Sequence, residues 1–320
     1  MGESKSAILA NLDRVPEFIL VSKALPRTRR IRAAIDFMTE RGLSFPVVLK
    51  PDVGERGAGV AIVRSDGELA SYFAVAGADT IVQKYVGGME FGIFYYRLPG
   101  QAKGQIFSIT EKRFPAVVGD GSSTIAELIL RDERAVCLSS LYLARIKRSA
   151  EDIPAPGESV SLAELGSHCR GAVFLNGAML ETAALRSAVD SVARKFSGFY
   201  FGRFDVRSES VEQLQRGQFE VLELNGVSAE ATHIYDPSVT LRGAYRALFQ
   251  QWRLAFEIGA LNRQRGQQPM TLREFAALLR TRVGTTSSGP GGGSGEGSVH
   301  QGCDWPSTMQ HQSMPRSMRG

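Results

Sequence analysis

The chain has 320 residues, of which 43% are hydrophobic, and it carries a formal net charge of +5 with a pI near 9.2. This length and composition are typical of a globular protein of one or two domains, and no apolar run reaches the length of a membrane span. Basic and acidic residues alternate along most of the sequence without a recognition motif, so the high pI does not indicate nucleic-acid binding.

The cysteines and the N-terminus indicate the compartment. Cys137, Cys169 and Cys303 are widely spaced and odd in number, which argues against a disulfide framework and against a structural zinc site. The first residues lack the apolar core of a secretion signal. We therefore predict a soluble, cytoplasmic protein that does not associate with membranes.

The first predicted elements are a strand over residues 15–21 and an amphipathic helix over residues 30–41. The helix carries apolar side chains at the spacing of one face, and Gly42 follows as its stop. These apolar side chains are Ile31, Ala34, Ile35 and Met38.

A glycine-rich turn follows an apolar strand that ends in a lysine. The strand covers residues 45–50, and Lys50 is its last residue. Three glycines within six residues allow positive φ and a close approach to a ligand, so successive N–H groups can bind an anion. The pattern indicates a phosphate-binding flap, and the alternative is an ordinary hairpin turn with a solvated lysine. The glycines are Gly54, Gly57 and Gly59.

The flap is neither a P-loop nor a Rossmann turn, because a strand over residues 60–64 follows the glycines where both motifs need a helix. Ser65 and Glu68 then have the spacing of a capping box for a short helix. A strand over residues 80–86 leads into residues 87–97, which we expect to connect two lobes.

The middle of the chain is less regular. A Gly-Asp-Gly turn at residues 119–121 precedes a helix that Thr124 can cap, whereas residues 131–178 show little pattern. A clear apolar stripe then predicts a helix that ends at Gly198. The stripe consists of Leu185, Ala188, Val189, Val192, Ala193 and Phe196.

Two strands, joined by a polar turn, carry the most suggestive side chains. Alternate side chains of a strand share a face, so Arg203 and Asp205 point one way, and Glu223 and Asn225 converge from the second strand. Two carboxylates and a carboxamide are oxygen ligands that suit Mg²⁺. The alternative is an exposed hairpin with ordinary surface charges. The strands are predicted over residues 202–207 and 219–225.

The C-terminal part begins with a loop over residues 226–237 that leaves the second strand and so is expected to lie near its polar side chains. A long amphipathic helix and a short one that Thr271 caps follow. From residue 284 the composition changes to Gly, Ser, Pro, Gln and Met, which predicts disorder. The long helix is defined by Leu241, Ala244, Tyr245, Leu248, Trp252, Ala255 and Phe256, and the short one by Phe275, Leu278 and Leu279.

The order of these features resembles the ATP-grasp superfamily over roughly residues 5–260. The resemblance rests on the lysine-ending strand, the glycine flap, Gln83-Lys84-Tyr85-Val86-Gly87-Gly88-Met89-Glu90, Arg203-x-Asp205 and Glu223-x-Asn225. D-alanine:D-alanine ligases and the ATP-grasp domain of cyanophycin synthetases are the nearer look-alikes. Residues 113–129 also resemble the cyanophycin-synthetase segment that joins an Arg-containing strand to a Gly-Asp-Gly turn and a helix.

This resemblance implies an α+β fold of two lobes with nucleotide between them. We expect an N-terminal lobe with the flap over residues 1–82, a C-terminal lobe with a Mg²⁺ site over 83–265, a short helical extension over 266–283 and a disordered tail over 284–320. Related ligases usually carry an N-terminal Rossmann-like domain, which we expect this chain to lack. A homodimer or a partner chain is a candidate source of that domain.

The resemblance also assigns roles to individual residues. The metal ligands would be Asp205, Glu223 and Asn225, holding one or two Mg²⁺ ions or Mn²⁺. Arg203 would steady charge on the transferred phosphoryl group, and Arg113 would hold phosphate or a substrate carboxylate. The nucleotide would be bound by Lys5, Lys50 and Lys112 at the phosphates, by the flap glycines Gly54, Gly57 and Gly59, by Gln83, Lys84, Tyr85 and Val86 at the adenine, and by Glu90 at the ribose.

The activity that the resemblance implies is ATP-dependent ligation of a small carboxylate to a small amine, both amino-acid-like. The carboxylate would be activated as an acyl phosphate and the amine would attack it, releasing ADP and phosphate. Two alternatives stay open. One is a phosphotransferase that acts on a hydroxyl, and the other is a non-catalytic ATP-binding partner subunit.

Overall fold

The structure is a computed structural model of the chain, and it describes residues 4–54, 57–146, 148–164, 171–274 and 276–277. These residues form mixed α and β structure with antiparallel sheets. The chain divides into two compact units, Met1–Gln267 and Gln268–Gly320, and the described strands belong to the first. No helix in the described part is long and apolar enough to cross a bilayer. The tail over 284–320, which we predict to be disordered, lies outside the described residues.

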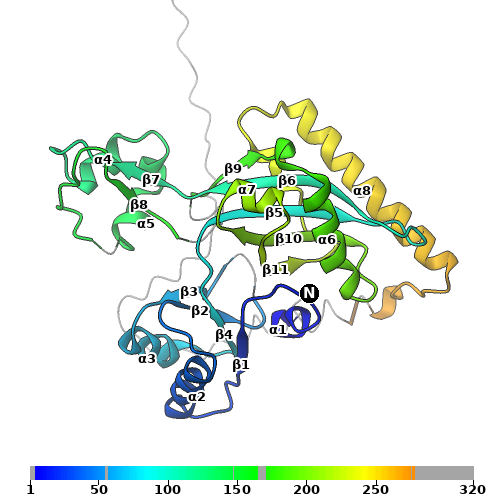
Figure 1. The fold of residues 1–320 in the computed structure, drawn as a ribbon, viewed down its shortest axis with the longest axis horizontal. Helices are drawn as coiled ribbons and strands as arrows, with labels where there is room; N and C mark the ends of the chain where they lie inside the picture. Colours follow the sequence, from blue (N-terminus) through cyan, green and yellow to red (C-terminus); the bar gives the residue numbers. More distant parts are fainter. Residues whose placement is uncertain (1–3, 55–56, 147, 165–170, 275, 278–320) are drawn as a thin grey trace, which may run out of the picture. The chain divides into compact units, whose positions relative to one another are not determined.

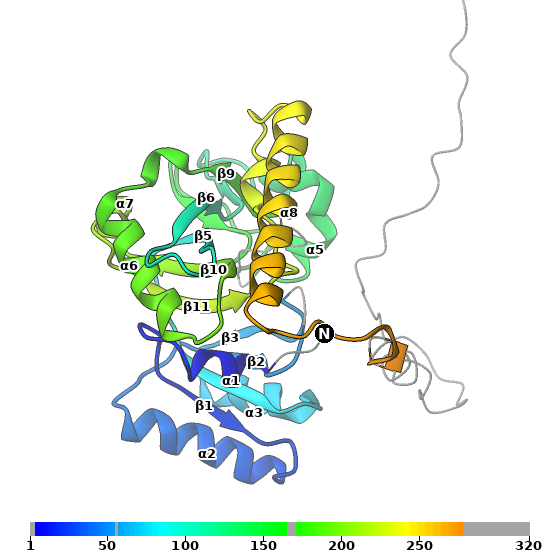
Figure 2. The same cartoon turned by 90° about the vertical axis from the view of Figure 1, so that its right-hand side faces the viewer.

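A four-stranded antiparallel sheet in the order β1-β4-β2-β3 forms from the N-terminal part of the described chain (Figure 1). Helices α2 (Arg27–Glu40) and α3 (Asp66–Val75) bury their apolar side chains against one face of it (Figure 2). Leu49 points into this core, so Lys50, the next residue of its strand, points to the other face. The strands are β1 (Phe18–Val21), β2 (Val47–Pro51), β3 (Ala61–Val63) and β4 (Thr80–Lys84).

A five-stranded antiparallel sheet in the order β11-β10-β5-β6-β9 positions most of the functional side chains. One face is apolar and packs on α6 (Ala183–Lys195), where Phe91, Ile93 and Phe204 are almost fully buried. The apolar stripe predicted for α6 is therefore confirmed. The opposite face is polar over part of its area and carries a second apolar cluster around Phe94 and Phe201 over the rest. The strands are β5 (Met89–Tyr96), β6 (Gln105–Arg113), β9 (Val173–Asn176), β10 (Phe201–Ser208) and β11 (Glu220–Asn225).

A small unit with its own core lies between β6 and β9 in the sequence; its first helix is the one that Thr124 was predicted to cap, and its later elements fall in the region that shows little sequence pattern. Two short strands pair antiparallel, and Val117, Ile125 and Val160 are buried between them and their helices. Figure 1 draws this unit in green. Its elements are β7 (Ala116–Val118), α4 (Ile125–Arg131), η1 (Ala135–Leu138), α5 (Ser139–Leu143) and β8 (Ser159–Ser161). The other short helices are α1 (Lys5–Leu9), α7 (Val211–Gln215), η3 (Ala178–Leu180) and η4 (Thr232–Tyr235).

Helix caps follow the predicted side chains with one difference. Thr124 and Glu127 form a complete capping box at α4. At α3, Ser65 accepts the predicted hydrogen bond from the Glu68 backbone N–H at 3.2 Å, but the Glu68 carboxylate accepts from Arg64 N–H instead of Ser65 N–H. The hydrogen bond predicted from Ser65 N–H to the Glu68 carboxylate is therefore wrong, because the carboxylate accepts from Arg64 N–H.

The predicted polar turn between β10 and β11 is wrong, because a short helix, α7, occupies this connection. Ser210 caps it by accepting a hydrogen bond from Gln213 N–H at 3.2 Å, and Leu214 is fully buried beneath it. One buried leucine and one cap suffice for a single helical turn packed on a core, although they give too short a pattern to be read as a helix.

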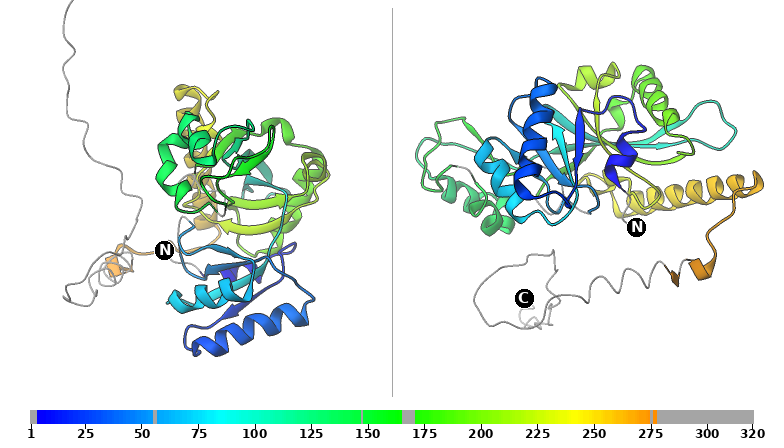
Figure 3. Two further views of the ribbon diagram at one scale, coloured as in Figure 1. Left: turned by 90° about the vertical axis from the view of Figure 1, so that its left-hand side faces the viewer. Right: turned by 90° about the horizontal axis from the view of Figure 1, so that it is seen from below.

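The long C-terminal helix α8 (Leu241–Gln264) is confirmed, but only part of the apolar set that defines it, namely Ala244, Leu248 and Ala255, lies on its partly buried side. Leu241 is 75% exposed and Phe256 is 78% exposed, whereas Gln251 and Ile258 are buried. The carboxamide of Gln251 explains this orientation, since it accepts from the N–H of Ala231 and donates to the carbonyl of Ala229, each at 3.0 Å. Figure 3 shows α8 in yellow and orange as one continuous helix. Within the short second helix, Phe275, Leu278 and Leu279 lie outside the described residues.

Candidate functional site

The polar face of the five-stranded sheet gathers charged side chains from three neighbouring strands. One rank across the sheet consists of Arg207 on β10, Glu90 on β5 and Lys112 on β6, which are direct cross-strand neighbours. The next rank on the same face contains Asp205, whose neighbour on β11 is Glu223. Because cross-strand neighbours share a face, the two ranks form one cluster.

Ion pairs connect the two ranks. Lys112 Nζ lies 2.9 Å from Glu90 Oε1 and 3.0 Å from Asp205 Oδ1, and all three side chains are buried. Arg203 holds the other side of Asp205 through hydrogen bonds of 2.9 and 3.2 Å. Burial opposes ionisation of Asp205, but Arg203 and Lys112 outweigh it and lower its pKa to about 2. Asp205 is therefore ionised at every physiological pH.

Gly92 makes room for this cluster. It lies on β5 between Asp205 and Thr110 in the sheet, and a Cβ built on it would meet Arg203 Cδ at 3.2 Å and Asp205 Oδ1 at 3.5 Å. A side chain at this position would therefore require the Arg203 side chain to shift by a few tenths of an ångström. The glycine thus lets Arg203 lie close against the Asp205 carboxylate.

The three predicted metal ligands lie together on paired strands. Asn225 Nδ2 donates to Asp205 Oδ2 at 3.1 Å, and Asp205 faces Glu223 across the strand pair. Glu223 is about one-third exposed, and the nearest cation is Lys5 Nζ at 3.8 Å. Among the described residues no group of three or more His, Cys, Asp or Glu side chains forms a cage. Two carboxylates and a carboxamide are donor types that suit Mg²⁺, which commonly binds one or two carboxylates and completes its shell with waters and phosphate oxygens. Both oxygens of Asp205 accept bonds from Arg203, Lys112 and Asn225, so an ion bound to Asp205 would replace one of these contacts.

Two lysines approach the cluster from the N-terminal sheet and from α1. Lys50 Nζ donates to the carbonyl of Leu222 at 3.0 Å but forms no ion pair with a described residue, and the side chain is buried. Burial lowers the pKa of Lys50 to about 8, and the positive charge of Lys5 adds to this while Glu223 opposes it. Lys5 Nζ donates to the carbonyl of Gly54 at 2.5 Å. Lys50 is therefore a buried cation that forms no direct ion pair within the described part of the chain, although Glu223 lies near enough to influence its pKa.

The cluster as a whole has an excess of positive charge. Its eight side chains comprise five cations and three carboxylates, which leaves two positive charges uncompensated. Buried charge of one sign is costly unless a counter-ion neutralises it, so this face is suited to a polyanion. The cations are Lys5, Lys50, Lys112, Arg203 and Arg207, and the carboxylates are Glu90, Asp205 and Glu223.

Arg207 makes most of the side-chain contacts at the end of the site where we expect the base and the ribose, and it was not among the predicted site residues. Its Nε and Nη2 donate to Glu90 Oε2 at 3.2 and 3.1 Å, its Nη1 donates to the carbonyl of Val86 at 2.7 Å, and its Nη2 donates to the carbonyl of Glu164 at 3.2 Å. The ring of Tyr85 lies 5.5 Å from the guanidinium carbon. Its position two residues beyond Asp205 on the same strand was the signal available in the sequence.

The other predicted adenine-binding residues are engaged within their own sheet. Gln83 is buried, and its Nε2 lies 3.5 Å from the carbonyl of Pro16. Lys84 donates its backbone N–H to the carbonyl of Glu17 at 2.9 Å, and its Nζ lies 3.4 Å from the Glu17 carboxylate. The structure therefore brings Tyr85 and Val86, but not these two side chains, to Arg207.

The structure does not bring Arg113 to the cluster. It follows Lys112 on β6 and so points to the other side, where its Nε donates to Glu111 at 2.7 Å, and its side chain is 63% exposed. In the loop after β11, the backbone carbonyl of Glu230 accepts from Arg203 Nη1 at 2.9 Å, which places that loop beside the cluster.

The flap has the predicted backbone geometry in its described residues. Gly57 and Gly59 both have φ of +71°, in the region that favours glycine. Gly59 also offers its carbonyl to the hydroxyl of Tyr72 at 2.8 Å. The turn therefore connects β2 to β3 next to Lys50, as the spacing predicts.

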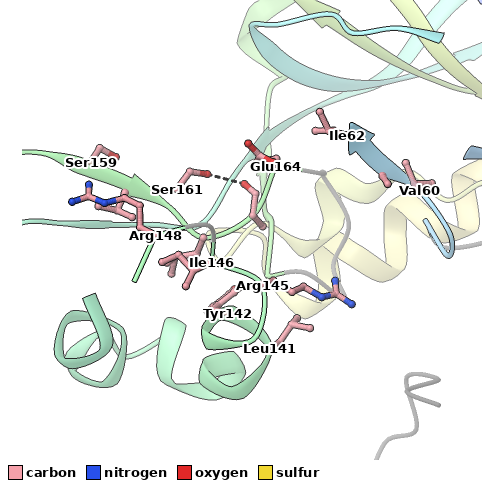
Figure 4. A pocket seen from close by; sticks show the side chains of 14 residues that line it. Val60, Ile62, Leu141, Tyr142, Arg145, Ile146, Arg148, Ser159, Ser161 and Glu164 are labelled. Atoms are coloured by element: carbon pink, nitrogen blue, oxygen red, sulfur yellow. Dashed lines mark hydrogen bonds between the residues drawn. The ribbon is translucent and has the colours of Figure 1, made fainter. Parts of the chain in front are cut away.

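A cavity of about 360 Å³ lies between β3 and the small unit, and no pattern in the sequence predicts it. Apolar side chains such as Ile62 and Ile146 line it together with Arg145, Arg148 and Glu164 (Figure 4). Glu164 joins the two sides by an ion pair of 2.5 Å to Arg64 at the end of β3. The cavity therefore borders the Arg207 end of the cluster.

No protein-family model and no curated protein matches the chain. Solved structures that it resembles include D-alanine–D-alanine ligase from Bacillus anthracis complexed with ATP, with 16% identity and a TM-score of 0.41 over 81% of this chain and 66% of that one. The bifunctional glutathione synthetase from Pasteurella multocida has 16% identity and a TM-score of 0.40, over 78% of this chain and 35% of that one. The D-cycloserine synthetase DcsG has 16% identity and a TM-score of 0.42, over 78% and 70%.

The solved structures to which the chain is similar are thus ligases and synthetases, and one of them, PsnB, is described as an ATP-grasp ligase. The chain spans about a third of the glutathione synthetase and 62% to 66% of the Bacillus anthracis ligase. At these identities and TM-scores the likeness says nothing of the chemistry, which has to be derived from the residues of the site.

Proposed function

We propose that the chain is an ATP- and Mg²⁺-dependent carboxylate–amine ligase that forms an amide through an acyl phosphate and releases ADP and phosphate. The observation that carries the proposal is the buried Lys50, which forms no direct ion pair with a described residue, beside a set of eight charged side chains that has two more cations than carboxylates and includes oxygen ligands. A nucleoside triphosphate and its metal ion complement this distribution of charge.

The residues of the chain act by holding and orienting the reactants. Lys50, Lys5 and Lys112 would neutralise the phosphates, and Arg203 would stabilise charge that develops on the transferred phosphoryl group. Asp205, Glu223 and Asn225 would hold Mg²⁺, which supplies further charge neutralisation when bound. Asp205 also keeps Arg203 and Lys112 in place through the ion pairs described above.

The reaction proceeds in two transfers. An oxygen of the substrate carboxylate attacks the γ-phosphorus, the bond to the β-phosphate oxygen breaks, and ADP leaves with that electron pair. The amine nitrogen then attacks the acyl carbon, and the carbon–oxygen bond to phosphate breaks as the amine loses a proton to solvent. Both steps need close positioning and stabilisation of negative charge, which the cationic face supplies.

A substrate screen tests the proposal directly. Amino acids and small acids are incubated in pairs with ATP and Mg²⁺, release of ADP and phosphate is measured, and products are identified by mass spectrometry. We expect equal amounts of ADP and phosphate together with a product whose mass is the sum of both substrates less one water. ADP without free phosphate, with a phosphorylated hydroxyl compound, would contradict the ligase in favour of a phosphotransferase.

Binding of ATP is expected to weaken as the pH rises through about 8, because only the protonated Lys50 neutralises phosphate. A pKa near 8 leaves the amine about 90% charged at pH 7 and about 10% charged at pH 9, so its contribution allows up to about a tenfold loss of affinity. Calorimetric titrations with ATP between pH 7 and 9 measure this loss.

The control for this pH series is Lys50→Arg, because a guanidinium stays charged throughout the range. We expect the affinity of this variant to change much less with pH than that of the unmodified protein. An identical pH dependence in both proteins would assign the titration to another group and remove Lys50 from the phosphate site.

A further inference from the structure

We propose that the solvent-facing side of α8 binds an amphipathic helix of another protein, one whose apolar seam is flanked by Asp or Glu side chains. The inference is independent of the proposed reaction, because it concerns a side of α8 that takes no part in the charged cluster. It starts from five large apolar side chains of α8 that are each more than half exposed. They are Leu241, Tyr245, Phe249, Trp252 and Phe256, and we call them the α8 seam.

The α8 seam is one continuous line along the helix. Its members are four, four, three and four residues apart, so they lie within about 80° of the helix circumference over about four turns. The steps of four, three and four from Tyr245 to Phe256 are the spacing at which two packed helices meet. Figure 2 shows α8 with no other described element in front of it. The α8 seam therefore has the geometry of one half of a helix pair.

The opposite side of α8 keeps the seam in the solvent. Gln251 is buried there, where it accepts a hydrogen bond from Ala231 N–H and donates one to the Ala229 carbonyl, each at 3.0 Å. Turning the helix to cover the seam would break both hydrogen bonds inside the protein, where an unpaired polar group is costly. Large apolar side chains that stay exposed in a row mark an interaction surface, and Tyr and Trp are among the residues that contribute most to such surfaces.

Arginines flank the α8 seam on its open side. Arg246 and Arg253 directly follow Tyr245 and Trp252, and both are exposed and form no ion pair with a described residue. They are seven residues apart, so they occupy the same position beside the seam in successive heptads. The whole of α8 contains four arginines and one glutamate. A partner helix with carboxylates at the facing positions complements this row of charge.

The same arginines disfavour a second copy of the chain as the partner. In an antiparallel pair of identical helices the two-fold axis brings each flank onto itself, so Arg246 and Arg253 would face the same arginines of the copy. A parallel pair would instead need the other flank of the seam. Leu248 and Ala255 lie on that flank and are partly buried, so it is closed to a partner.

The width of the α8 seam disfavours a lipid surface. A helix that packs on a broad apolar surface typically presents an apolar face of 100° or more, whereas a narrow line at heptad spacing is typical of a contact between two helices. Glu257, which directly follows Phe256 and is exposed, would also be repelled by anionic headgroups. The spacing and the charge therefore both favour a helix with an acidic flank.

The first test uses the unmodified full chain and two designed helical peptides of about four heptads. The peptides share a seam of leucine and isoleucine and differ at the flanking positions, which are glutamate in one and lysine in the other. Calorimetry at low salt should give a dissociation constant about tenfold lower for the glutamate peptide, and about 1 M salt should remove most of this difference. Equal affinities at low salt, or no binding of either peptide, would overturn the inference.

The second test removes the centre of the α8 seam by Trp252→Ala. We expect the affinity for the glutamate peptide to fall by about 30-fold or more, with an unchanged melting temperature because the side chain is exposed. The control is Val75→Ala, which truncates an apolar side chain of α3 that is 85% exposed and should leave binding unchanged. Undiminished binding by folded Trp252→Ala would place the peptide elsewhere and contradict the proposal.

Reversing the charge of the flank tests its chemistry. The double variant Arg246→Glu/Arg253→Glu should prefer the lysine peptide, because the attraction and the repulsion exchange places. Arg29→Glu/Arg194→Glu makes the same change in net charge at exposed positions of α2 and α6, and it should still prefer the glutamate peptide. A preference that inverts equally in both double variants would show that net charge, not the α8 flank, selects the peptide.

Two further measurements test the other occupants of this surface. Sedimentation should show the unmodified chain as a monomer, and it should not bind vesicles that contain phosphatidylserine. A dimer that Trp252→Ala abolishes would overturn the proposal in favour of a second copy. Vesicle binding that is tighter than peptide binding and is lost in the same variant would overturn it in favour of a lipid surface.

Discussion

Replacing Glu223 by glutamine is expected to lower Mg²⁺-dependent turnover by roughly 100-fold or more while the fold is retained. The substitution keeps the size of the side chain but removes one negative charge from the proposed ligand set, and the loss corresponds to about 2.7 kcal/mol of transition-state stabilisation. Glu223 is partly exposed and its nearest cation is 3.8 Å away, so the folded protein depends little on it. Steady-state kinetics over a range of Mg²⁺ concentrations measures the effect.

Measuring nucleotide binding without metal shows whether Glu223 is a metal ligand or a residue that only supports its strand. Calorimetry with ATP in the presence of a chelator should give similar affinities for Glu223→Gln and the unmodified protein, because the lysine contacts remain. Glu257→Gln, on the exposed side of α8, makes the same chemical change away from the site and should leave both measurements unchanged. Full Mg²⁺-dependent turnover in Glu223→Gln would contradict the metal assignment.

Replacing Asp205 by asparagine is expected to destabilise the protein by about 3–5 kcal/mol at pH 7, which lowers the melting temperature by roughly 10 °C. Asp205 is buried between Arg203 and Lys112, and losing its charge leaves two buried cations with fewer partners. Its pKa of about 2 lies below the usual value of 3.8, so the stabilisation is present above about pH 4 and is lost as the pH falls toward 2. Thermal unfolding followed by circular dichroism measures both quantities.

Measurements of stability at acidic pH test whether the effect of Asp205→Asn is electrostatic. The difference in stability between the variant and the unmodified protein should shrink as the pH is lowered from 4 toward 2. Asp36→Asn, which breaks an exposed pair with Arg32, is the control and should cost well under about 1 kcal/mol at either pH. A constant difference across this range would show that the effect of the substitution is not electrostatic.

The alternation of side chains along a strand was sufficient to predict the core of the site. Arg203, Asp205, Glu223 and Asn225 do lie on one face of paired strands, and Lys112 reaches the same face from β6. This succeeded because the side-chain period of a strand is fixed at two, whatever the rest of the fold does. The lysine at the end of β2 was found for a similar local reason.

The features of the site and fold that were not predicted depend on contacts between distant parts of the chain. Arg207 was missed because its partners, among them Val86 and Glu164, are far from it in sequence. Arg113 was assigned to the site together with its neighbour Lys112, but adjacent residues of a strand point to opposite faces. Arg113 therefore lies away from the cluster, where it pairs with Glu111. The buried face of α8 is chosen by the hydrogen bonds of Gln251, which a hydrophobic pattern cannot register.

The position of the small unit makes it an exchangeable module. Strands β6 and β9 are antiparallel neighbours, and Arg113 opposite Val173 is the last pair before the chain departs. The two ends of the module stay close, since Leu162 N–H donates to the carbonyl of Pro115 at 2.8 Å. Replacing the module by a two-residue Asn-Gly turn would therefore convert β6 and β9 into a plain hairpin without altering their register. That replacement would remove one wall of the cavity together with Phe114 and Glu164, the two contacts through which the module touches Arg207.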